Sequence, residues 1–311
     1  MGTFKGVCFL SGLYQTEPID PRRTFTKVQR AHNLRQNPHQ FTTHDFTMNA
    51  FTLLLVWTGW RSLQPIGEIR SIYSTKFGAP RQGAIVPDAV ATLTLSLTDI
   101  DAHQALEGLN EYSHVWLLWA AHLNEHDAKQ AKVRAPHLRG DRAGLFSTRS
   151  PFRPNPIGLS LVRLEAVQGN TLRLSGVDLV DGTPVLDIKP YLPYADTPSA
   201  GDVRVAEWVD PPPLHEVTFA LEAEAALKET SAMAGALTSD VEQLRRALVQ
   251  TLAADPRPVY RWRREQKSGG AADYDVHVDG VEWRCRFELA SPDADAERVT
   301  VLGPSALFRG R

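Results

Sequence analysis

The sequence predicts a mainly β protein, in which a closed or strongly curved β structure is followed by a small α+β domain. Many short segments alternate apolar and polar residues, as half-buried strands do, with little helix between them. Pro211-Pro212-Pro213 then interrupts this pattern, and helix-like stretches follow. We therefore expect a β domain over residues 65–210 and an α+β domain over 214–311, preceded by an extension over 1–64.

The N-terminal extension has a composition of its own. Its residues include seven Lys or Arg against three acids, with neither helical nor strand periodicity. A basic, acid-poor targeting segment is one interpretation. We favour a poorly ordered extension, with Met48 as a plausible later start. No apolar run in the chain approaches the ~20 residues of a membrane-spanning helix.

Glycine, asparagine, aspartate and proline separate the strand candidates of the β domain, which is typical of turns. The candidates are residues 66–72, 89–97, 114–121, 157–167, 171–177 and 203–209. The segment 114–121 is continuously apolar and predicts a strand buried on both faces. One helix is expected in this domain, over about 101–109.

The α+β domain shows helical spacing followed by a hairpin pattern. Alanine, leucine, glutamate and arginine recur as on amphipathic helices over residues 219–236 and 239–253. Pro256 and Pro258 follow the second helix and stop it. Residues 274–278 and 282–289 then predict two strands joined by a turn at Asp279-Gly280.

Composition excludes several classes of protein. A net charge of −2, from 34 Lys and Arg against 36 Asp and Glu, excludes a uniformly basic nucleic-acid binder. Two cysteines, Cys8 and Cys285, cannot form a disulfide framework, which favours a reducing, cytoplasmic compartment. No two glycines stand two residues apart and no Gly-Lys-Ser/Thr occurs, so a nucleotide-like cofactor would not be held by a dinucleotide fingerprint or a Walker motif.

Two segments are densest in residues capable of chemistry. Residues 148–158 read Thr-Arg-Ser-Pro-Phe-Arg-Pro-Asn-Pro-Ile-Gly, a stiff loop that would hold its polar donors in place before a ligand arrives. Residues 178–191 combine three aspartates and an Asp-Gly turn with Lys189 and Tyr191, which suit a ribose, a phosphate or a base. The plainer interpretation of each is an ordinary turn with solvated charges. Pro80-Arg81-Gln82 is a third, weaker candidate loop.

Local charge is more informative than net charge. Between residues 129 and 153 there are seven basic residues and one acid, Asp141. The basic residues are Lys129, Lys132, Arg134, Arg139, Arg142, Arg149 and Arg153. This excess suits a phosphate backbone, although a solvated flexible loop has the same composition.

His122-Leu123-Asn124-Glu125-His126 matches the inverted zincin pattern, in which a helix presents two histidines to zinc. Here the pattern follows a predicted strand, and no third ligand is positioned convincingly. We therefore expect no metal, and we interpret His122 as a residue that could line a pocket at the end of its strand.

The dense segments resemble the TrmO family, also called the YaeB or TsaA-like family, of S-adenosylmethionine (SAM)-dependent tRNA adenine N6-methyltransferases. The matching stretches are 66–71, 80–82, 146–158 and 178–193, and Asp255-Pro256-Arg257-Pro258-Val259-Tyr260 resembles the family's C-terminal domain. The resemblance covers roughly residues 65–290. It implies a compact β-barrel that binds SAM outside the Rossmann framework, and a homodimer. The implied substrate is tRNA carrying N6-threonylcarbamoyladenosine beside the anticodon.

The resemblance also implies roles for individual residues. The implied cofactor contacts are Pro80, Arg81, Gln82, His122, Leu123, Arg149, Leu159, Asp178, Asp181, Gly182 and Thr183. The candidate catalytic residues are Asp187, Lys189 and Tyr191. Candidate contacts to the tRNA anticodon stem-loop are Arg153, Asn155, Lys132 and Arg134.

In the corresponding hypothesis for the mechanism, Asp187 removes the N6 proton while the methyl group arrives, and Lys189 or Arg149 contacts the carbamoyl oxygen or the threonyl carboxylate. Tyr191 stacks on the modified base. Two alternatives share many of these features. One is a SAM- or tRNA-binding module without transferase activity, and the other is a zinc hydrolase that uses the histidine pair.

Overall fold

The computed structural model describes residues 63–124, 130–134, 141–209, 214–238, 240–258, 261, 271–289 and 297–308. These residues belong to one compact unit, Leu63–Arg311. The expected N-terminal extension lies outside the described residues except for its last two, and so does the triple proline at 211–213. None of the described helices is long and apolar enough to cross a membrane.

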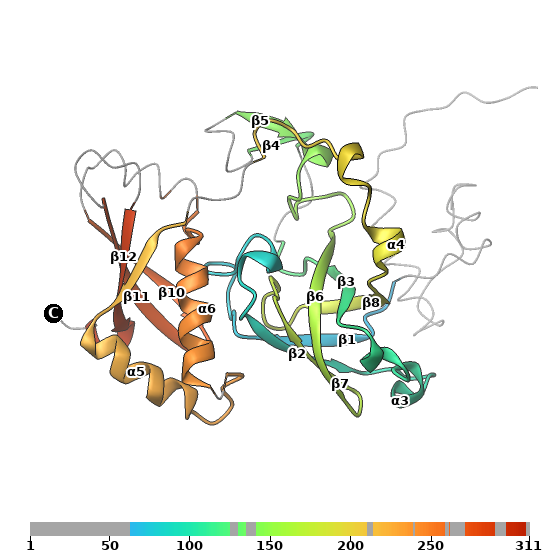
Figure 1. The fold of residues 1–311 in the computed structure, drawn as a ribbon, viewed down its shortest axis with the longest axis horizontal. Helices are drawn as coiled ribbons and strands as arrows, with labels where there is room; N and C mark the ends of the chain where they lie inside the picture. The colour runs from blue at the N-terminus through green and yellow to red at the C-terminus, as the bar shows by residue number, and fades with distance from the viewer. Residues whose placement is uncertain are drawn as a thin grey trace, which may run out of the picture. The chain divides into compact units, whose positions relative to one another are not determined.

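Six strands close into a barrel, which confirms the predicted β class (Figure 1). Every neighbouring pair in the barrel is antiparallel, and closure removes the unpaired edges of an open sheet. In their order around the barrel, the strands are β1 (Gly67–Ser71), β2 (Val90–Leu95), β7 (Thr171–Ser175), β6 (Ile157–Gln168), β3 (His114–Ala120) and β8 (Pro184–Pro190).

Aliphatic side chains fill the interior of the barrel. They include Ile69, Leu93, Val115, Leu117, Val162, Leu172, Leu174 and Val185. The expectation that both faces of β3 are buried is wrong, because Trp116 and Leu118 are only half-buried on its outer face. A closed barrel has one filled interior, so only alternate residues of β3 can enter it.

The connections confirm one expected element and remove another. Residues 101–109 do contain a helix, α3 (Ala102–Ala105), and the Asp101 side chain caps it by accepting a hydrogen bond from the backbone N–H of Gln104 at 2.9 Å. The strand expected at 203–209 is absent from these described residues, and Val203, Val205 and Val209 are exposed there. Branched side chains favour a strand only where a neighbouring strand packs against them.

Short elements carry the remaining motifs of the β region. They are η1 (Gly83–Ile85), η2 (Leu109–Glu111), β4 (Lys132–Arg134), β5 (Arg142–Gly144), η4 (Leu145–Ser147), α4 (Pro193–Asp196) and η5 (Ala200–Asp202). Strands β4 and β5 pair with each other in a two-stranded antiparallel sheet, which we call the basic ribbon.

The C-terminal part forms a second, four-stranded sheet with two helices. Its elements are β9 (Glu216–Phe219), α5 (Leu221–Ser231), α6 (Val241–Ala253), β10 (Ala272–Val278), β11 (Val281–Leu289), β12 (Glu297–Pro304) and η6 (Ser305–Phe308), with the sheet in the order β10-β11-β12-β9. The predicted hairpin is confirmed, because β10 and β11 pair around Asp279 and Gly280 in left-handed conformations. The first helix is shorter than expected, since Phe219 belongs to β9.

One hydrophobic cluster joins the β1–β2 connection to the C-terminal sheet and helices. Ile72, Tyr73 and Val86 from that connection share it with residues such as Leu248 of α6 and Trp283 of β11. The Tyr73 hydroxyl also hydrogen-bonds Thr251 Oγ1 at 3.0 Å. The connection that carries Pro80-Arg81-Gln82 is therefore held between the barrel and the C-terminal part.

Candidate active site

A half-buried carboxylate, Asp178, lies where three of the sequence motifs meet. Its Oδ1 accepts a hydrogen bond of 2.6 Å from Ser160 Oγ, which in turn accepts one of 3.0 Å from Trp119 Nε1. The backbone N–H of Gly83 also donates to this carboxylate, and the positive charge of Arg149 lies nearby. Burial raises the pKa of Asp178, although these hydrogen bonds and the Arg149 charge act in the opposite direction.

Arg149 links the proline-rich loop to the β1–β2 connection, because its Nη1 donates to Gln82 Oε1. The β1–β2 connection also packs closely against the segment that follows β7, because a Cβ atom added at Gly83 would collide with the carbonyl oxygen of Gly176. Gln82, Arg149 and Asp178, which are far apart in the sequence, therefore form one group, which we call the barrel-end group. Asp178 of the second dense segment thus lies near Arg149 of the first.

The proline-rich loop is held by its own polar groups. Arg153 Nη1 donates to three carbonyl groups of this loop, those of Leu145, Thr148 and Ser150, at 3.4, 2.9 and 3.4 Å. Asn124 at the end of β3 donates to the carbonyl of Pro151 at 2.8 Å. Arg153, which we expected to bind substrate, is thus occupied within the loop, whereas Asn155 is exposed.

The turn between β7 and β8 is fixed against β1. Asp181 Oδ1 accepts a hydrogen bond of 2.9 Å from the backbone N–H of Ser71, and buried Thr183 donates from Oγ1 to the carbonyl of Val180 at 2.6 Å. Gly182 has a φ of 76°, which favours glycine, and a Cβ there would lie 3.9 Å from His122 Nε2. The structure therefore brings exposed His122 to this turn, while Asp181 and Thr183 mainly shape it.

The predicted catalytic residues of β8 lie on the outer face of the barrel. Lys189 Nζ forms an ion pair of 2.8 Å with Asp187 Oδ2, and both side chains are roughly half exposed. The strand register places Asp187 opposite Leu118 and Lys189 opposite Trp116, the half-buried residues on the outer face of β3. No hydrogen bond or ion pair between described residues joins this pair to the barrel-end group.

Tyr191 continues the same face. Its ring centroid lies 6.2 Å from that of Trp116, and its hydroxyl hydrogen-bonds Thr197 Oγ1 at 2.6 Å. On the other side of β3, Leu159 of β6 pairs with Leu118 and is 57% exposed. The outer face of β3, β6 and β8 thus combines apolar surface with the Asp187–Lys189 ion pair.

Three further predicted cofactor residues make fewer contacts. Arg81 and Leu123 are exposed and Pro80 is half-buried. Partial desolvation of its guanidinium lowers the pKa of Arg81, and the nearby carboxylate of Asp255 in the C-terminal part acts in the opposite direction. These placements leave the predicted cofactor roles as proposals.

Sequence reasoning missed Ser160 and Trp119, which hold the Asp178 carboxylate. Strand periodicity contains part of the signal, because alternation along β6 places Ser160 on the same inward face as Val162. Alternation along β3 likewise places Trp119 on the inward face with Val115 and Leu117, where it packs against the barrel core.

The basic ribbon carries the predicted tRNA-contacting cations. Lys132 and Arg134 alternate onto one face of β4, and the register places Arg142 of β5 directly opposite Arg134. All three residues are exposed. Of the remaining predicted cations, Lys129 and Arg139 lie outside the described residues.

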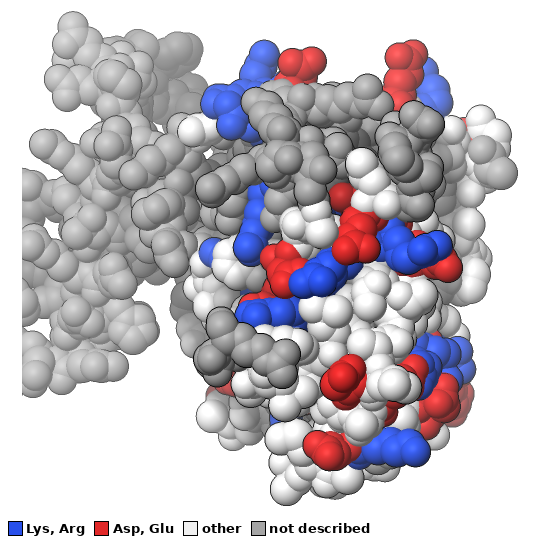
Figure 2. Space-filling view, turned by 90° about the vertical axis from the view of Figure 1, so that its left-hand side faces the viewer, with Lys and Arg blue, Asp and Glu red and all other residues white. Residues whose placement is uncertain are grey.

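The outer face of the C-terminal sheet has a different charge arrangement. Figure 2, which views the left-hand side of Figure 1, shows acidic and basic side chains intermingled there. The arginine ion pairs on this face, among the described residues, are Arg284–Asp275 at 3.0 Å, Arg286–Asp273 at 2.8 Å and Arg298–Glu216 at 2.9 Å. Its arginines are therefore neutralised within the protein.

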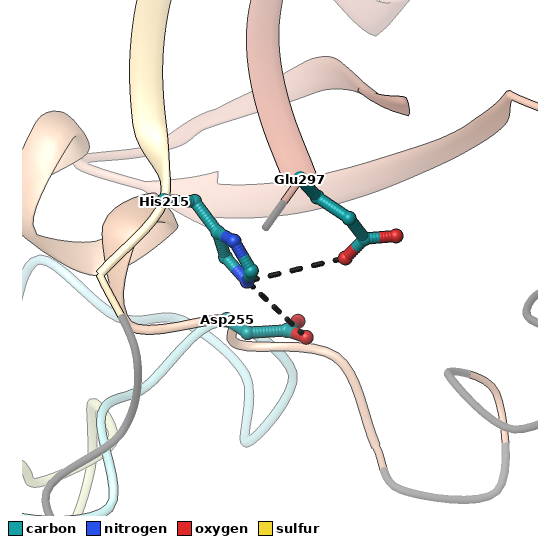
Figure 3. Close-up of side chains that lie close together, drawn as sticks. All are labelled: His215, Asp255 and Glu297. Carbon is teal, nitrogen blue, oxygen red and sulfur yellow. Dashed lines mark ion pairs between the residues drawn. The ribbon is translucent and has the colours of Figure 1, made fainter. Parts of the chain in front are cut away.

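A buried ionic cluster lies in the C-terminal part, where His215, Asp255 and Glu297 converge (Figure 3). Their potential ligand atoms lie within 4.8 Å of one another. Arg257 already supplies a cation, because its fully buried side chain donates to Asp255 at 2.8 and 2.9 Å and also to Glu297. The arrangement is that of an internal ion cluster. Of the histidine pattern considered for zinc, Glu125 and His126 lie outside the described residues.

Burial opposes ionisation of Asp255, but hydrogen bonds from His215 and Arg257 outweigh burial and lower its pKa to about 2. The carboxylate therefore stays ionised and paired at neutral pH. The Arg257 guanidinium also lies 3.9 Å from the centroid of the Phe287 ring. This cluster joins the loop after α6 to the beginning of β12.

A surface groove of about 350 Å³ lies elsewhere on the C-terminal part. It is lined by Ala226, Glu229, Thr230, Met233, Gly280, Val281, Glu282, Pro304 and Ala306. Neither of the two dense sequence segments contributes to it, and its two glutamates disfavour a phosphate. The barrel-end group remains the better candidate site.

Comparison with known proteins agrees with this assignment. The model of the tRNA-methyltransferase O N-terminal domain matches residues 68–197, which hold the barrel and its motifs. Barrel, motifs and family model together define a tRNA methyltransferase that lies outside the Rossmann class.

Relatives extend the match beyond the barrel. A protein of Pseudomonas aeruginosa described as a putative SAM-dependent methyltransferase, RcsF, is 45% identical over 70% of this chain and 91% of its own length. The Escherichia coli tRNA (adenine(37)-N6)-methyltransferase is 39% identical over 71% of this chain and 92% of its own. A crystal structure of TrmO from Pseudomonas aeruginosa matches with a TM-score of 0.57 and 36% identity, covering 78% of this chain and 97% of that one. The chain belongs to the TrmO family, which confirms the resemblance.

Proposed function

We propose that this chain transfers a methyl group from SAM to N6 of threonylcarbamoyladenosine next to the anticodon of tRNA. Two relatives supply the chemical class, since one is described as SAM-dependent and the other as a tRNA (adenine(37)-N6)-methyltransferase. The observation that carries the proposal is the convergence of Gln82, Arg149 and Asp178 from three separate segments. A group held in place before the ligand arrives loses little entropy on binding.

The barrel-end group is the proposed cofactor site. SAM supplies, when bound, a methyl group on a positively charged sulfur that a nucleophile can displace. The Asp178 carboxylate is oriented by Ser160 and by the backbone of Gly83, which leaves it suited to accept hydrogen bonds from an amine or a hydroxyl. Arg149, held by Gln82, can meet a carboxylate bidentately.

The outer face of β8 is the proposed acceptor site. In the transfer, the bond from N6 to the methyl carbon forms while the carbon–sulfur bond breaks, and the sulfur keeps the electron pair of that bond. N6 of a carbamoylated adenosine is a poor nucleophile, so a base that removes its proton would assist the step. Asp187 is the proposed base, with Lys189 beside it and Tyr191 as a stacking surface for the purine.

We further propose that the protein acts in the cytoplasm as a homodimer. The buried free thiol of Cys285 fits a reducing compartment. The half-buried Trp116 and Leu118 and the exposed Leu159 give the outer face of the barrel an apolar surface that a second copy would cover. Such a contact would place the acceptor residues of one subunit beside its partner.

The test is Asp187→Asn with modified tRNA and labelled SAM. We expect cofactor affinity to stay near the wild-type value and turnover to fall by about 10²–10⁴-fold, which is typical of a lost general base. Glu165→Gln is the matched control, because Glu165 forms a comparable surface pair with Arg163 at 3.2 Å.

Normal turnover in Asp187→Asn would remove the base assignment. If the wild-type protein binds SAM and tRNA but transfers no methyl group, it is a binding module, and the proposed function fails.

A further inference from the structure

Phe146 is an exposed aromatic residue within a stretch of well-anchored backbone. Its side chain is 77% exposed, compared with 43% for Phe77 and 47% for Phe152. It lies in η4, where the preceding residue, Leu145, is buried. Because the short helix directs Leu145 inward, its neighbour Phe146 is directed outward. The fold therefore presents this ring to solvent on a fixed turn.

A fixed cation supports the ring. The guanidinium carbon of Arg153 lies 5.3 Å from the centroid of the Phe146 ring. Arg153 is itself held by the three carbonyl groups of its loop, so neither partner can move freely. A positively charged group against an aromatic ring favours a further electron-rich π-system on the ring's open surface.

The groups around Phe146 indicate which class of molecule would bind there. The backbone N–H of Leu145 donates to the carbonyl of Ala131 at 2.9 Å, which joins η4 to the beginning of the basic ribbon. A short distance along the chain in the other direction, Arg149 reaches the barrel-end group. An aromatic ring next to solvated cations is the combination with which proteins bind unpaired nucleotides. A second copy of this chain docking through the same face in a two-fold contact would instead bring the same cations together, which repel one another.

We propose that Phe146 stacks on an unpaired base of the tRNA anticodon loop while the basic ribbon contacts the phosphates. The inference rests on the proposed function, because it takes tRNA as the substrate. It adds a specific binding residue between the cations and the cofactor site.

The test uses an unmodified anticodon stem-loop RNA that carries 2-aminopurine at one loop position at a time. Phe146→Ala should bind this RNA about 5- to 100-fold more weakly, the range expected for losing one stacked base. The salt dependence of binding should keep the wild-type slope, since no phosphate contact is removed. The 2-aminopurine signal that the wild-type protein produces at one loop position should disappear.

Two further variants make the result specific. Phe146→Tyr keeps an aromatic face and should restore both affinity and signal. Phe77→Ala removes another exposed phenyl ring, one with a lysine 5.7 Å from its centroid, and should behave like the wild type. Unchanged RNA affinity in Phe146→Ala, a flatter salt slope, or a change of oligomeric state in place of the binding defect would each overturn the inference.

Failure of the proposed function gives a different result. If the wild-type protein leaves threonylcarbamoylated tRNA unmethylated while Phe146 behaves as expected, the methylation proposal fails and the stacking assignment stands.

Discussion

The basic ribbon and the outer face of the C-terminal sheet both expose arginines, but the residues opposite these arginines in the strand register differ in charge. On the sheet, Arg284 lies directly opposite Asp275 and Arg286 directly opposite Asp273 in the register, so each charge is matched across strands. On the ribbon, Arg134 lies directly opposite Arg142. Like charges opposite one another destabilise a strand pair, whereas opposite charges stabilise it.

The difference separates structural from functional charge. Among the described residues, no carboxylate lies within 4.0 Å of Lys132, Arg134 or Arg142, and the contact of Arg142 is a neutral one with Gln130 at 3.3 Å. A fold gains nothing for its own stability from such an arrangement. An external polyanion would supply a countercharge that the described residues do not, which supports the tRNA interface proposed for the ribbon. The net charge of −2 for the whole chain reveals neither the paired arginines of the sheet nor, among the described residues, the unpaired cations of the ribbon.

The same comparison can be made with a buried charge, Arg257, whose replacement is expected to have the largest effect on stability. Arg257→Met should lower the free energy of unfolding by about 3–5 kcal/mol, because it leaves two carboxylates buried without their cation. Arg286→Met on the sheet face is the matched control and should lower it by at most about 1 kcal/mol, since its pair with Asp273 is solvated. Urea unfolding measures both values. Equal losses would mean that burial does not distinguish the two pairs.

Lowering the pH should reduce the free energy of unfolding that the buried cluster around Arg257 contributes, by less than the Arg257 substitution does. The pKa of Asp255 is about 2 in the folded protein and ~3.9 in an unfolded chain, so its contribution is fully present above the unfolded value. It is lost as the pH falls towards 2, and it amounts to about 2–3 kcal/mol. Unfolding followed between about pH 6 and pH 2 should therefore show a shallower acid dependence for Asp255→Asn than for the wild type. Parallel curves would show that Asp255 is not a source of acid sensitivity.

Alternating hydrophobicity predicted the barrel because β1, β2, β6 and β7 each have one buried face, and period two reports that property directly. The pattern failed where tertiary neighbours decide. The valines at 203–209 found no partner strand, and β12 was not expected, although its register with β11 closes the C-terminal core.

The candidate site likewise depends on tertiary contacts that local sequence patterns do not contain. Composition singled out both Arg149 and Arg153, since both lie in the proline-rich loop. It could not show that Arg153 binds its own loop while Arg149 reaches Gln82, because Gln82 is 67 residues away in the sequence. The catalytic and cofactor roles of individual residues stay predictions.

The smallest expected effect tests the opening comparison directly. Replacing Lys132, Arg134 and Arg142 together by alanine should weaken tRNA binding by about tenfold at moderate salt and reduce the slope of log affinity against log salt by about 2, because up to three phosphate contacts disappear. The control replaces Arg284, Arg286 and Arg298 by alanine on the sheet face. These arginines are already neutralised by carboxylates, so affinity and slope should not fall. The sheet variant should not lose as much salt dependence as the ribbon variant if ion pairing within the protein determines which cations bind RNA. An equal loss in both variants would contradict this, and unpaired cations would then not identify the tRNA interface.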